Sequence, residues 1–290
     1  MESAEKDRLA GYGYAVLAAT LWALLGPVSR LCFAGGVEPL EVAFWRAAIG
    51  ALCFAVHGAF KKQLGVPARH AAYFLGFGLT GVGLFFYSYQ LAVKEGGAAL
   101  AVVLLYTAPA WVALLSRILF KEAFTRLKST ALLVAMLGTG LVCFSGGSLG
   151  AAPSVWGLGC GLGAGLLYAT HYPFYNWWQS RYSTATLYTY MLLAGALAIY
   201  PFLDISLDKS LITWGALLFL GCFCTYGAYL AYGQGLRRIS PVRAAVVSNF
   251  EPVFGTLLAW AWWGENFSHL GWLGFALVLG AVFLLTSDRR

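Results

Sequence analysis

Residues 89–127 read YQLAVKEGGAALAVVLLYTAPAWVALLSRILFKEAFTRL, and residues 232–270 read YGQGLRRISPVRAAVVSNFEPVFGTLLAWAWWGENFSHL. A shift of 143 positions (232 minus 89) superposes the two stretches without a gap. Coincident leucines and alanines are common in apolar chains, but three coincident pairs are harder to obtain by chance: Pro109 and Pro252, Glu122 and Glu265, and Phe124 and Phe267. Repetition at a fixed offset indicates a duplicated structural unit, so we expect two copies of one fold.

The composition places this duplicated unit in a membrane. Of the 290 residues, 60% are hydrophobic and 11% are charged, whereas roughly one-quarter of a soluble domain is charged. A helix needs about 20 apolar residues to cross a bilayer, so with short connections the chain holds about ten spans. Continuous apolar runs such as 98–119 and 270–286 favour helices over the alternating strands of a β-barrel. We therefore predict an all-α membrane protein with ten transmembrane helices, near residues 11–31, 37–60, 71–93, 97–119, 129–146, 155–177, 184–203, 211–233, 241–262 and 269–286.

The basic residues predict the orientation of these helices. With the N-terminus inside, fifteen Lys and Arg residues fall in or beside cytoplasmic segments and three fall outside, with Arg46 set aside as intramembrane. Cytoplasmic loops of membrane proteins carry such an excess. We expect a multi-pass protein of the cell's inner (plasma) membrane with both termini in the cytoplasm. The net charge of +7 then mostly reflects the excess of basic residues in cytoplasmic segments, and no nucleic-acid partner is predicted.

The duplication divides the chain into two halves. Earlier in each half, a shift of 146 (173 minus 27) aligns Pro27 with Pro173. We predict a cytoplasmic N-terminus (1–10), a first five-helix repeat (11–146), a linker (147–154), a second five-helix repeat (155–286) and a cytoplasmic C-terminus (287–290). Because five is odd, the second repeat is inverted, as in secondary transporters that work by alternating access. Substrate sites in such proteins lie near the midplane beside interrupted helices, for which the candidate hinges are Pro27, Pro109, Pro173 and Pro252.

The chain resembles the ten-helix, EamA-type members of the drug/metabolite transporter superfamily over essentially its whole length. The resemblance rests on a fourth and a ninth helix with Pro at the middle and Glu at the end, in residues 106–122 and 249–265. It also rests on Trp22 and Arg46 in the first two helices, and it departs at two positions where Gly is common, Ala23 and Lys121. The resemblance implies transport and favours export of amino acids or related metabolites, but the family moves many unrelated compounds.

Arg46 and Glu251 are charged residues predicted near the middle of the membrane. At 1.5 Å per residue, each lies roughly 14 Å from a membrane face. An ionisable group there costs at least about 2.5–3.5 kcal/mol, so each is expected to have a partner or to line a water-filled cavity. Glu251 is a candidate for proton coupling or amine binding, and Arg46 for clamping a carboxylate or phosphate. The structural alternative is a mutual ion pair, or pairing with a helix end, that only orders the bundle.

Further candidates lie on the proline-bearing helices. His171, two residues before Pro173, suits a proton relay or a substrate hydrogen bond, and its structural alternative is a bond to a carbonyl freed by that proline. Buried hydroxyl and indole groups need hydrogen-bond partners, so several aromatic residues are expected to line a cavity. The structural alternative for each of them is packing in the core or against lipid. The predicted lining residues are Trp22, Trp45, Tyr106, Tyr168 and Tyr172, with Asn249 at the repeat position of Tyr106. An aromatic cage with Glu251 suits an amine, and the addition of Arg46 suits a zwitterion such as a bulky amino acid.

Other sequence features carry weaker signals. Glu41 and Trp45 share a helix face that suits an outer vestibule for cations, and the alternative for Glu41 is a solvated helix start. The six cysteines have no disulfide or redox spacing and are predicted to be small core residues. The sequence has no Cys, His and carboxylate cluster with metal-ligand spacing and no ATP-binding loop, so neither a metal nor a cofactor is predicted. It also lacks nucleophile and protease motifs, so it is not predicted to be an enzyme.

The leading hypothesis is a secondary active transporter of a small organic metabolite, with an amino acid or related zwitterion as the preferred substrate. Proton coupling through Glu251 or His171 is an open part of this hypothesis. A carrier of organic cations or drugs is the first alternative and would depend on Glu251 but little on Arg46. A non-transporting membrane scaffold is the second and would respond to no ligand. The expected partners are the small-molecule substrate and the lipid bilayer, and the sequence is compatible with a monomer or a homodimer.

Overall fold

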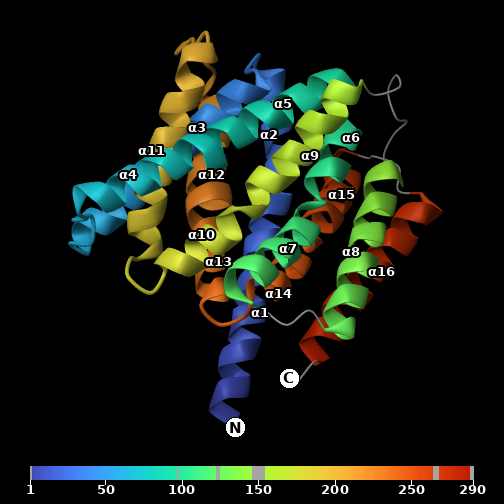
Figure 1. Cartoon of the computed structure of the whole chain (residues 1–290). Coiled ribbons are helices and arrows are strands. Elements are labelled where there is room, and N and C mark those ends of the chain that lie inside the picture. Colours follow the sequence, from blue (N-terminus) through green and yellow to red (C-terminus); the bar gives the residue numbers. More distant parts are fainter. Residues whose placement is uncertain (1, 97, 122–124, 146–153, 264–267, 288–290) are drawn as a thin grey trace.

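The computed structural model describes residues 2–96, 98–121, 125–145, 154–263 and 268–287, and every regular element within them is helical (Figure 1). The first half contains α1 (Glu2–Ala23), α2 (Leu25–Ala34), α3 (Pro39–Phe60), α4 (Ala68–Phe77), η1 (Gly78–Leu84), α5 (Phe85–Gly96), α6 (Ala98–Leu105), α7 (Ala108–Phe120) and α8 (Arg126–Ser145). The second half contains α9 (Val155–Ala169), α10 (His171–Trp178), α11 (Thr184–Ile199), η2 (Tyr200–Phe202), α12 (Leu211–Gly221), η3 (Cys222–Gly227), α13 (Ala228–Leu236), α14 (Pro241–Ser248), α15 (Phe250–Trp263) and α16 (His269–Ser287). The repeated Glu122 and Glu265 and nearly all of the predicted linker lie outside the described residues.

Many of these helices are long and apolar enough to cross a membrane. Seven such stretches occur in the described residues: Glu5–Ala34, Pro39–Phe60, Ala68–Glu95, Ala101–Phe120, Thr184–Phe202, Leu211–Leu236 and Pro241–Trp262. α8, α9 and α16 are further apolar helices. The predicted all-helical membrane fold is therefore confirmed, while the number of ten spans stays a prediction.

Four helical stretches are interrupted by the same local chemistry. The leading helices end at Ala23, Leu105, Ala169 and Ser248, which are four residues before Pro27, Pro109, Pro173 and Pro252 respectively. Proline lacks an N–H, and its ring clashes with the carbonyl group four residues earlier, so a regular helix does not pass through it. The interruptions therefore lie at the candidate hinges.

Two other stretches share a different irregularity. The π-helical segment η1 begins at Gly78, and the π-helical segment η3 begins at Cys222, 144 positions later (222 minus 78). In η3 the Thr225 hydroxyl donates to the carbonyl of Leu220 at 3.0 Å, five residues back. Such wide turns are rare and often accompany functional sites. Their matching places in the two halves support the proposed division into two repeats.

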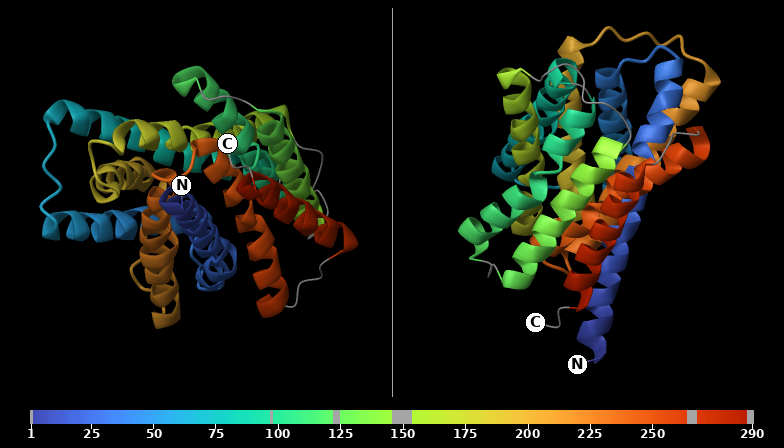
Figure 2. Two further views of the ribbon diagram at one scale, coloured as in Figure 1. Left: turned by 90° about the horizontal axis from the view of Figure 1, so that it is seen from below. Right: turned by 90° about the vertical axis from the view of Figure 1, so that its right-hand side faces the viewer.

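Helices of the first half pack against helices of the second half. α8 runs alongside α16, α3 packs against α11, α5 against α9 and α1 against α13 (Figures 1 and 2). A Cβ atom at Gly138 would lie 2.7 Å from the carbonyl oxygen of Gly274, so α8 and α16 cross with their backbones in contact. The start of α1 and the end of α16 lie at the same end of the molecule (Figure 2). Inside the bundle, α7 packs against α14 and α1 packs against both α14 and α15.

Candidate substrate site

Polar side chains from three separate segments meet at Glu251, near the start of α15. The Tyr106 hydroxyl donates a hydrogen bond to the Glu251 carboxylate, and the Arg46 guanidinium lies close enough to act on it electrostatically. Tyr106 lies at the break between α6 and α7, and Glu251 follows the break between α14 and α15. Because α7 packs against α14, the two breaks are brought close to each other. The structure thus brings together three of the predicted site residues, Arg46, Tyr106 and Glu251.

Arg46 reaches from α3 to the second half of the chain. Its Nε atom donates to Thr225 Oγ1 at 3.4 Å, and its guanidinium carbon lies 5.8 Å from the centroid of the Phe86 ring. A guanidinium group carries five N–H donors in a fixed fork. Among the described residues, the bond to Thr225 engages one of them, so donors are left for a ligand carboxylate or phosphate.

An aromatic cluster lies beside the polar residues Arg46, Tyr106 and Glu251. It consists of Trp22, Tyr168, Tyr172, Tyr229 and Tyr232. The Trp22 ring lies 5.6 Å from Tyr229 and 5.1 Å from Tyr232 between centroids. Tyr172 lies 5.5 Å from Tyr232 and 5.9 Å from Tyr168. Tyr168, Tyr172 and Tyr229 lie within electrostatic range of the Glu251 carboxylate.

Asn249 is a buried polar residue at the break itself. Its side chain is 1% exposed, and neither its Oδ1 nor its Nδ2 atom has a hydrogen-bond partner among the described residues. A buried amide without partners costs free energy, so such groups are rare unless a ligand or water satisfies them. Its predicted role in substrate binding is compatible with this position and stays a prediction.

Two other predicted site residues have fixed partners elsewhere. The Trp45 indole donates to Glu41 Oε1 at 3.0 Å, and its ring packs on Trp214 at 4.9 Å. Glu41 itself is 5% exposed and forms an ion pair with Lys209 Nζ at 2.9 Å. The expected outer vestibule and the expected solvated helix start are therefore both wrong for Glu41, because a lysine from the segment before α12 neutralises its charge.

His171 binds a carbonyl group, but not one freed by Pro173. Its Nε2–H donates to the carbonyl oxygen of Gly81 in η1 at 2.6 Å. Its ring also packs edge-on against Phe77, with 5.1 Å between centroids. The structural alternative, a bond to a carbonyl freed by Pro173, is therefore wrong for His171, because its partner is Gly81. The proton-relay role of His171 stays a prediction.

Thr225, Tyr229 and Tyr232 belong to the site but were not predicted from the sequence. A weak signal existed for the two tyrosines, since residues three apart share a helix face and Tyr232 aligns with Tyr89 in the repeat. Nothing in the sequence indicated that Thr225 would receive the Arg46 hydrogen bond, because that contact joins residues far apart in the chain.

A family model for EamA-like transporters matches residues 9–144 and again residues 155–287. The chain belongs to the EamA-like transporter family. Among curated relatives, an uncharacterized inner membrane transporter, YicL, of Salmonella typhimurium is 29% identical over 224 residues, covering 70% of this chain and 69% of the relative. An uncharacterized transporter of Archaeoglobus fulgidus is 26% identical, covering 87% of this chain and 90% of the relative. A solved crystal structure superposes with a TM-score of 0.82 at 21% identity over 97% of this chain and 96% of the other, which shows the shared fold.

Membership of the EamA-like family confirms the resemblance stated from the sequence. An EamA-like protein with these apolar helices is an integral, multi-pass membrane protein. Its relatives are transporters, so the chain is a transporter and not an enzyme. Family membership does not identify the substrate, which depends on the residues of the candidate site.

Proposed function

We propose that this EamA-like protein is a secondary carrier for small zwitterionic metabolites, with bulky amino acids as the preferred substrates and export as the preferred direction. The observation that carries the proposal is the approach of Arg46, from the first half, to Glu251, from the second half, beside an aromatic cluster. A zwitterion has two opposite charges and a side chain, and this arrangement offers one group for each.

The chemistry assigns each part of the substrate to a residue. Arg46 would bind the carboxylate through its forked donors, and Glu251 would bind the ammonium group. The faces of Trp22 and its neighbouring tyrosines would hold an apolar or aromatic side chain. When no substrate is bound, Arg46 and Glu251 partly neutralise each other, which lowers the cost of placing both charges within a bilayer.

The proposed mechanism is alternating access. The two repeats (11–146 and 155–286) would rock around the site, with the breaks at Pro27, Pro109, Pro173 and Pro252 as hinges. Glu251 would carry the coupling proton, since it would also bind the substrate ammonium group and lies within electrostatic range of Arg46. The positive-inside bias supports insertion in the inner (plasma) membrane with both termini in the cytoplasm.

An organic-cation carrier is the second candidate. The observation in its favour is the aromatic cluster around a carboxylate, because aromatic faces and a carboxylate together bind quaternary ammonium groups. In that case Arg46 would serve only to order the site.

Three matched ligands test the proposal: leucine, leucine methyl ester, which lacks the carboxylate, and N-acetylleucine, which lacks the ammonium charge. A quaternary amine, tetraethylammonium, completes the panel. A ligand of the folded protein raises its melting temperature by an amount that reports affinity. The test measures this shift for the wild type and for Arg46→Ala and Glu251→Gln. Arg117→Ala and Glu38→Gln serve as controls because both side chains are exposed.

We expect leucine to stabilise the wild type more than either derivative does. Loss of one charge-assisted hydrogen bond removes about 1.5–3 kcal/mol, or roughly 10-fold to 150-fold in affinity. Leucine binding should therefore weaken by that factor in both site variants and stay unchanged in both controls. Tetraethylammonium binding that is lost only in Glu251→Gln would favour the cation carrier. If the protein is folded and no ligand shifts its melting temperature, both carrier hypotheses are contradicted.

A further inference from the structure

Two cysteine side chains from opposite halves of the chain lie in contact. The Sγ atoms of Cys53, in α3, and Cys222, the first residue of η3, are 3.7 Å apart. Formation of a disulfide would require the sulfur atoms to approach by about 1.7 Å, to the 2.05 Å bond length. Both side chains are partly exposed, unlike the buried Cys32 and Cys224. The sequence predicted core cysteines, and this expectation was wrong for Cys53, Cys160 and Cys222, which are all partly exposed.

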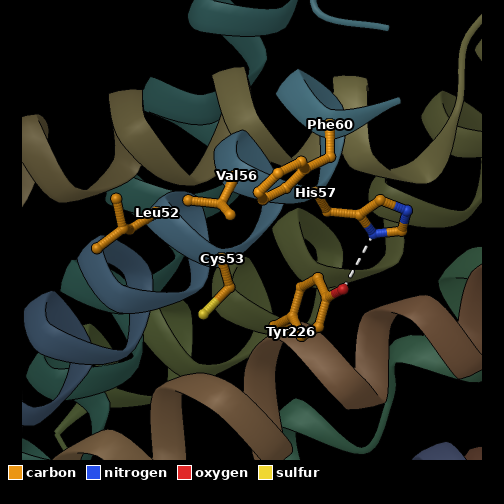
Figure 3. Close-up of a pocket in the computed structure, with 6 residues that line it drawn as sticks. All are labelled: Leu52, Cys53, Val56, His57, Phe60 and Tyr226. Atoms are coloured by element: carbon orange, nitrogen blue, oxygen red, sulfur yellow. Dashed lines mark hydrogen bonds between the residues drawn. The ribbon is translucent and has the colours of Figure 1, made fainter. Parts of the chain in front are cut away.

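The Cys53 side chain lines a groove on the outside of the helix bundle. The groove has a volume of about 560 Å³ and is lined by Leu52, Cys53, Val56, His57, Phe60 and Tyr226 (Figure 3). Leu52, Val56 and Phe60 are 63%, 46% and 84% exposed, as expected of side chains that face lipid. An apolar reagent dissolved in the bilayer can therefore reach the Cys53 thiol.

The backbones, and not only two side-chain rotamers, hold these thiols together. A Cβ atom at Gly221 would lie 2.5 Å from the Cβ of Ile49, and one at Gly50 would lie 2.8 Å from the Cγ2 of Thr225. At this crossing α3 approaches α12 and η3 so closely that a larger residue does not fit. The short distance between the sulfur atoms follows from this approach.

The same crossing also carries the Arg46 contact. Thr225, which accepts the Arg46 hydrogen bond, lies three residues after Cys222 in η3. On α3, Cys53 lies seven residues (53 minus 46) after Arg46, which is two helical turns, or about 10 Å. A covalent bond between Cys53 and Cys222 would therefore fix α3 against η3 next to the candidate substrate site.

We propose that Cys53 and Cys222 form an oxidative modification site at which an organic hydroperoxide of the membrane phase produces a reversible disulfide between the two halves. The Cys53 sulfur attacks the peroxide O–O bond and becomes a sulfenic acid, while its proton leaves with the alcohol product. The Cys222 sulfur then displaces the sulfenic oxygen as water, and the S–S bond forms. Two thiols lose two electrons and two protons, and the hydroperoxide is reduced to alcohol and water.

The disulfide has a functional consequence that rests on the proposed carrier function. Alternating access requires the halves to move against each other, and the bond joins them beside Arg46. The oxidised protein is thus held in the described packing, and transport stops until a reductant restores the thiols.

The test uses the purified full-length protein in lipid nanodiscs, treated with cumene hydroperoxide. Non-reducing digestion and mass spectrometry should find a peptide pair linked through Cys53 and Cys222, which dithiothreitol removes. The pair should be absent from Cys53→Ser and Cys222→Ser and present in Cys224→Ser, the control for a buried cysteine two residues away. Counting of free thiols in the wild type, before and after oxidation, gives a measurement that does not depend on any variant.

The absence of this linked pair, with the thiol count unchanged, would overturn the site. The consequence for transport is measured in proteoliposomes, where oxidation should reduce leucine flux at least 10-fold and reductant should restore it. A linked pair with unchanged flux would overturn the arrest of transport. A linked pair in a protein that moves no ligand even when reduced would uphold the site and contradict the proposed carrier function, so the two failures can be told apart.

Discussion

Replacement of Glu41 by Gln should strongly destabilise the protein, although Glu41 has no part in the proposed substrate site. The Lys209 and Glu41 side chains are 5% and 7% exposed, and the Lys209 Nζ atom lies 2.9 Å from Glu41 Oε1. The pair ties the segment before α12 to α3, and Trp45 donates a second hydrogen bond to the same carboxylate oxygen. Loss of the Glu41 charge leaves the lysine ammonium group buried beside the neutral amide.

The size of the effect follows from this burial. Removal of one partner of a buried ion pair costs about 3–5 kcal/mol, because the remaining charge has lost both water and its counter-charge. Replacement of both partners removes that penalty. We therefore expect Glu41→Gln and Lys209→Met each to lose about 3 kcal/mol or more, and the double variant to lie within about 1 kcal/mol of wild type.

The assay is a double-mutant cycle on the free energy of unfolding. Each protein would be unfolded reversibly in mixed micelles and followed by circular dichroism. Glu38→Gln, at the exposed start of the same helix, serves as the control and should change stability by less than about 0.5 kcal/mol. If the losses of the two single variants simply add in the double variant, the pair is not coupled and the reasoning from burial is refuted.

Three further predictions concern the site and the packing. Tyr106→Phe removes the donor to Glu251 and should weaken leucine binding roughly 10-fold in the melting titration, whereas Tyr200→Phe, on an exposed residue, should not. Gly138→Leu should cost at least about 1–3 kcal/mol of stability by denaturant unfolding, because α8 and α16 cross there, whereas Gly140→Leu faces open space and should be tolerated. If Glu251 carries the coupling proton, Glu251→Gln proteoliposomes should lose uptake driven by a pH gradient but keep exchange of labelled for unlabelled substrate. Equal uptake by the variant and the wild type would contradict that role.

The sequence by itself determined the class of fold and the places where helices break. Long apolar runs specify membrane helices because the bilayer core requires every backbone polar group to be paired within its own segment. Each of the four repeat-related prolines interrupts a helix four residues upstream, because the steric clash that causes the break is local. The same local information identified Arg46 and Glu251, since a charge in an apolar run is conspicuous whatever surrounds it.

Only the tertiary structure decided which of these groups meet. Glu41 with Lys209 and Cys53 with Cys222 are contacts between residues 168 (209 minus 41) and 169 (222 minus 53) positions apart. Arg46 lies within electrostatic range of Glu251, 205 positions (251 minus 46) away. The apolar pattern sets the depth of a side chain in the membrane, but it leaves open the direction in which the side chain points around its helix. That direction is set by helix packing, here through close glycine contacts such as Gly221 against Ile49. The sequence could therefore name Arg46 and Glu251 as possible partners, but it could not predict that Glu41 would pair with Lys209 or Cys53 with Cys222.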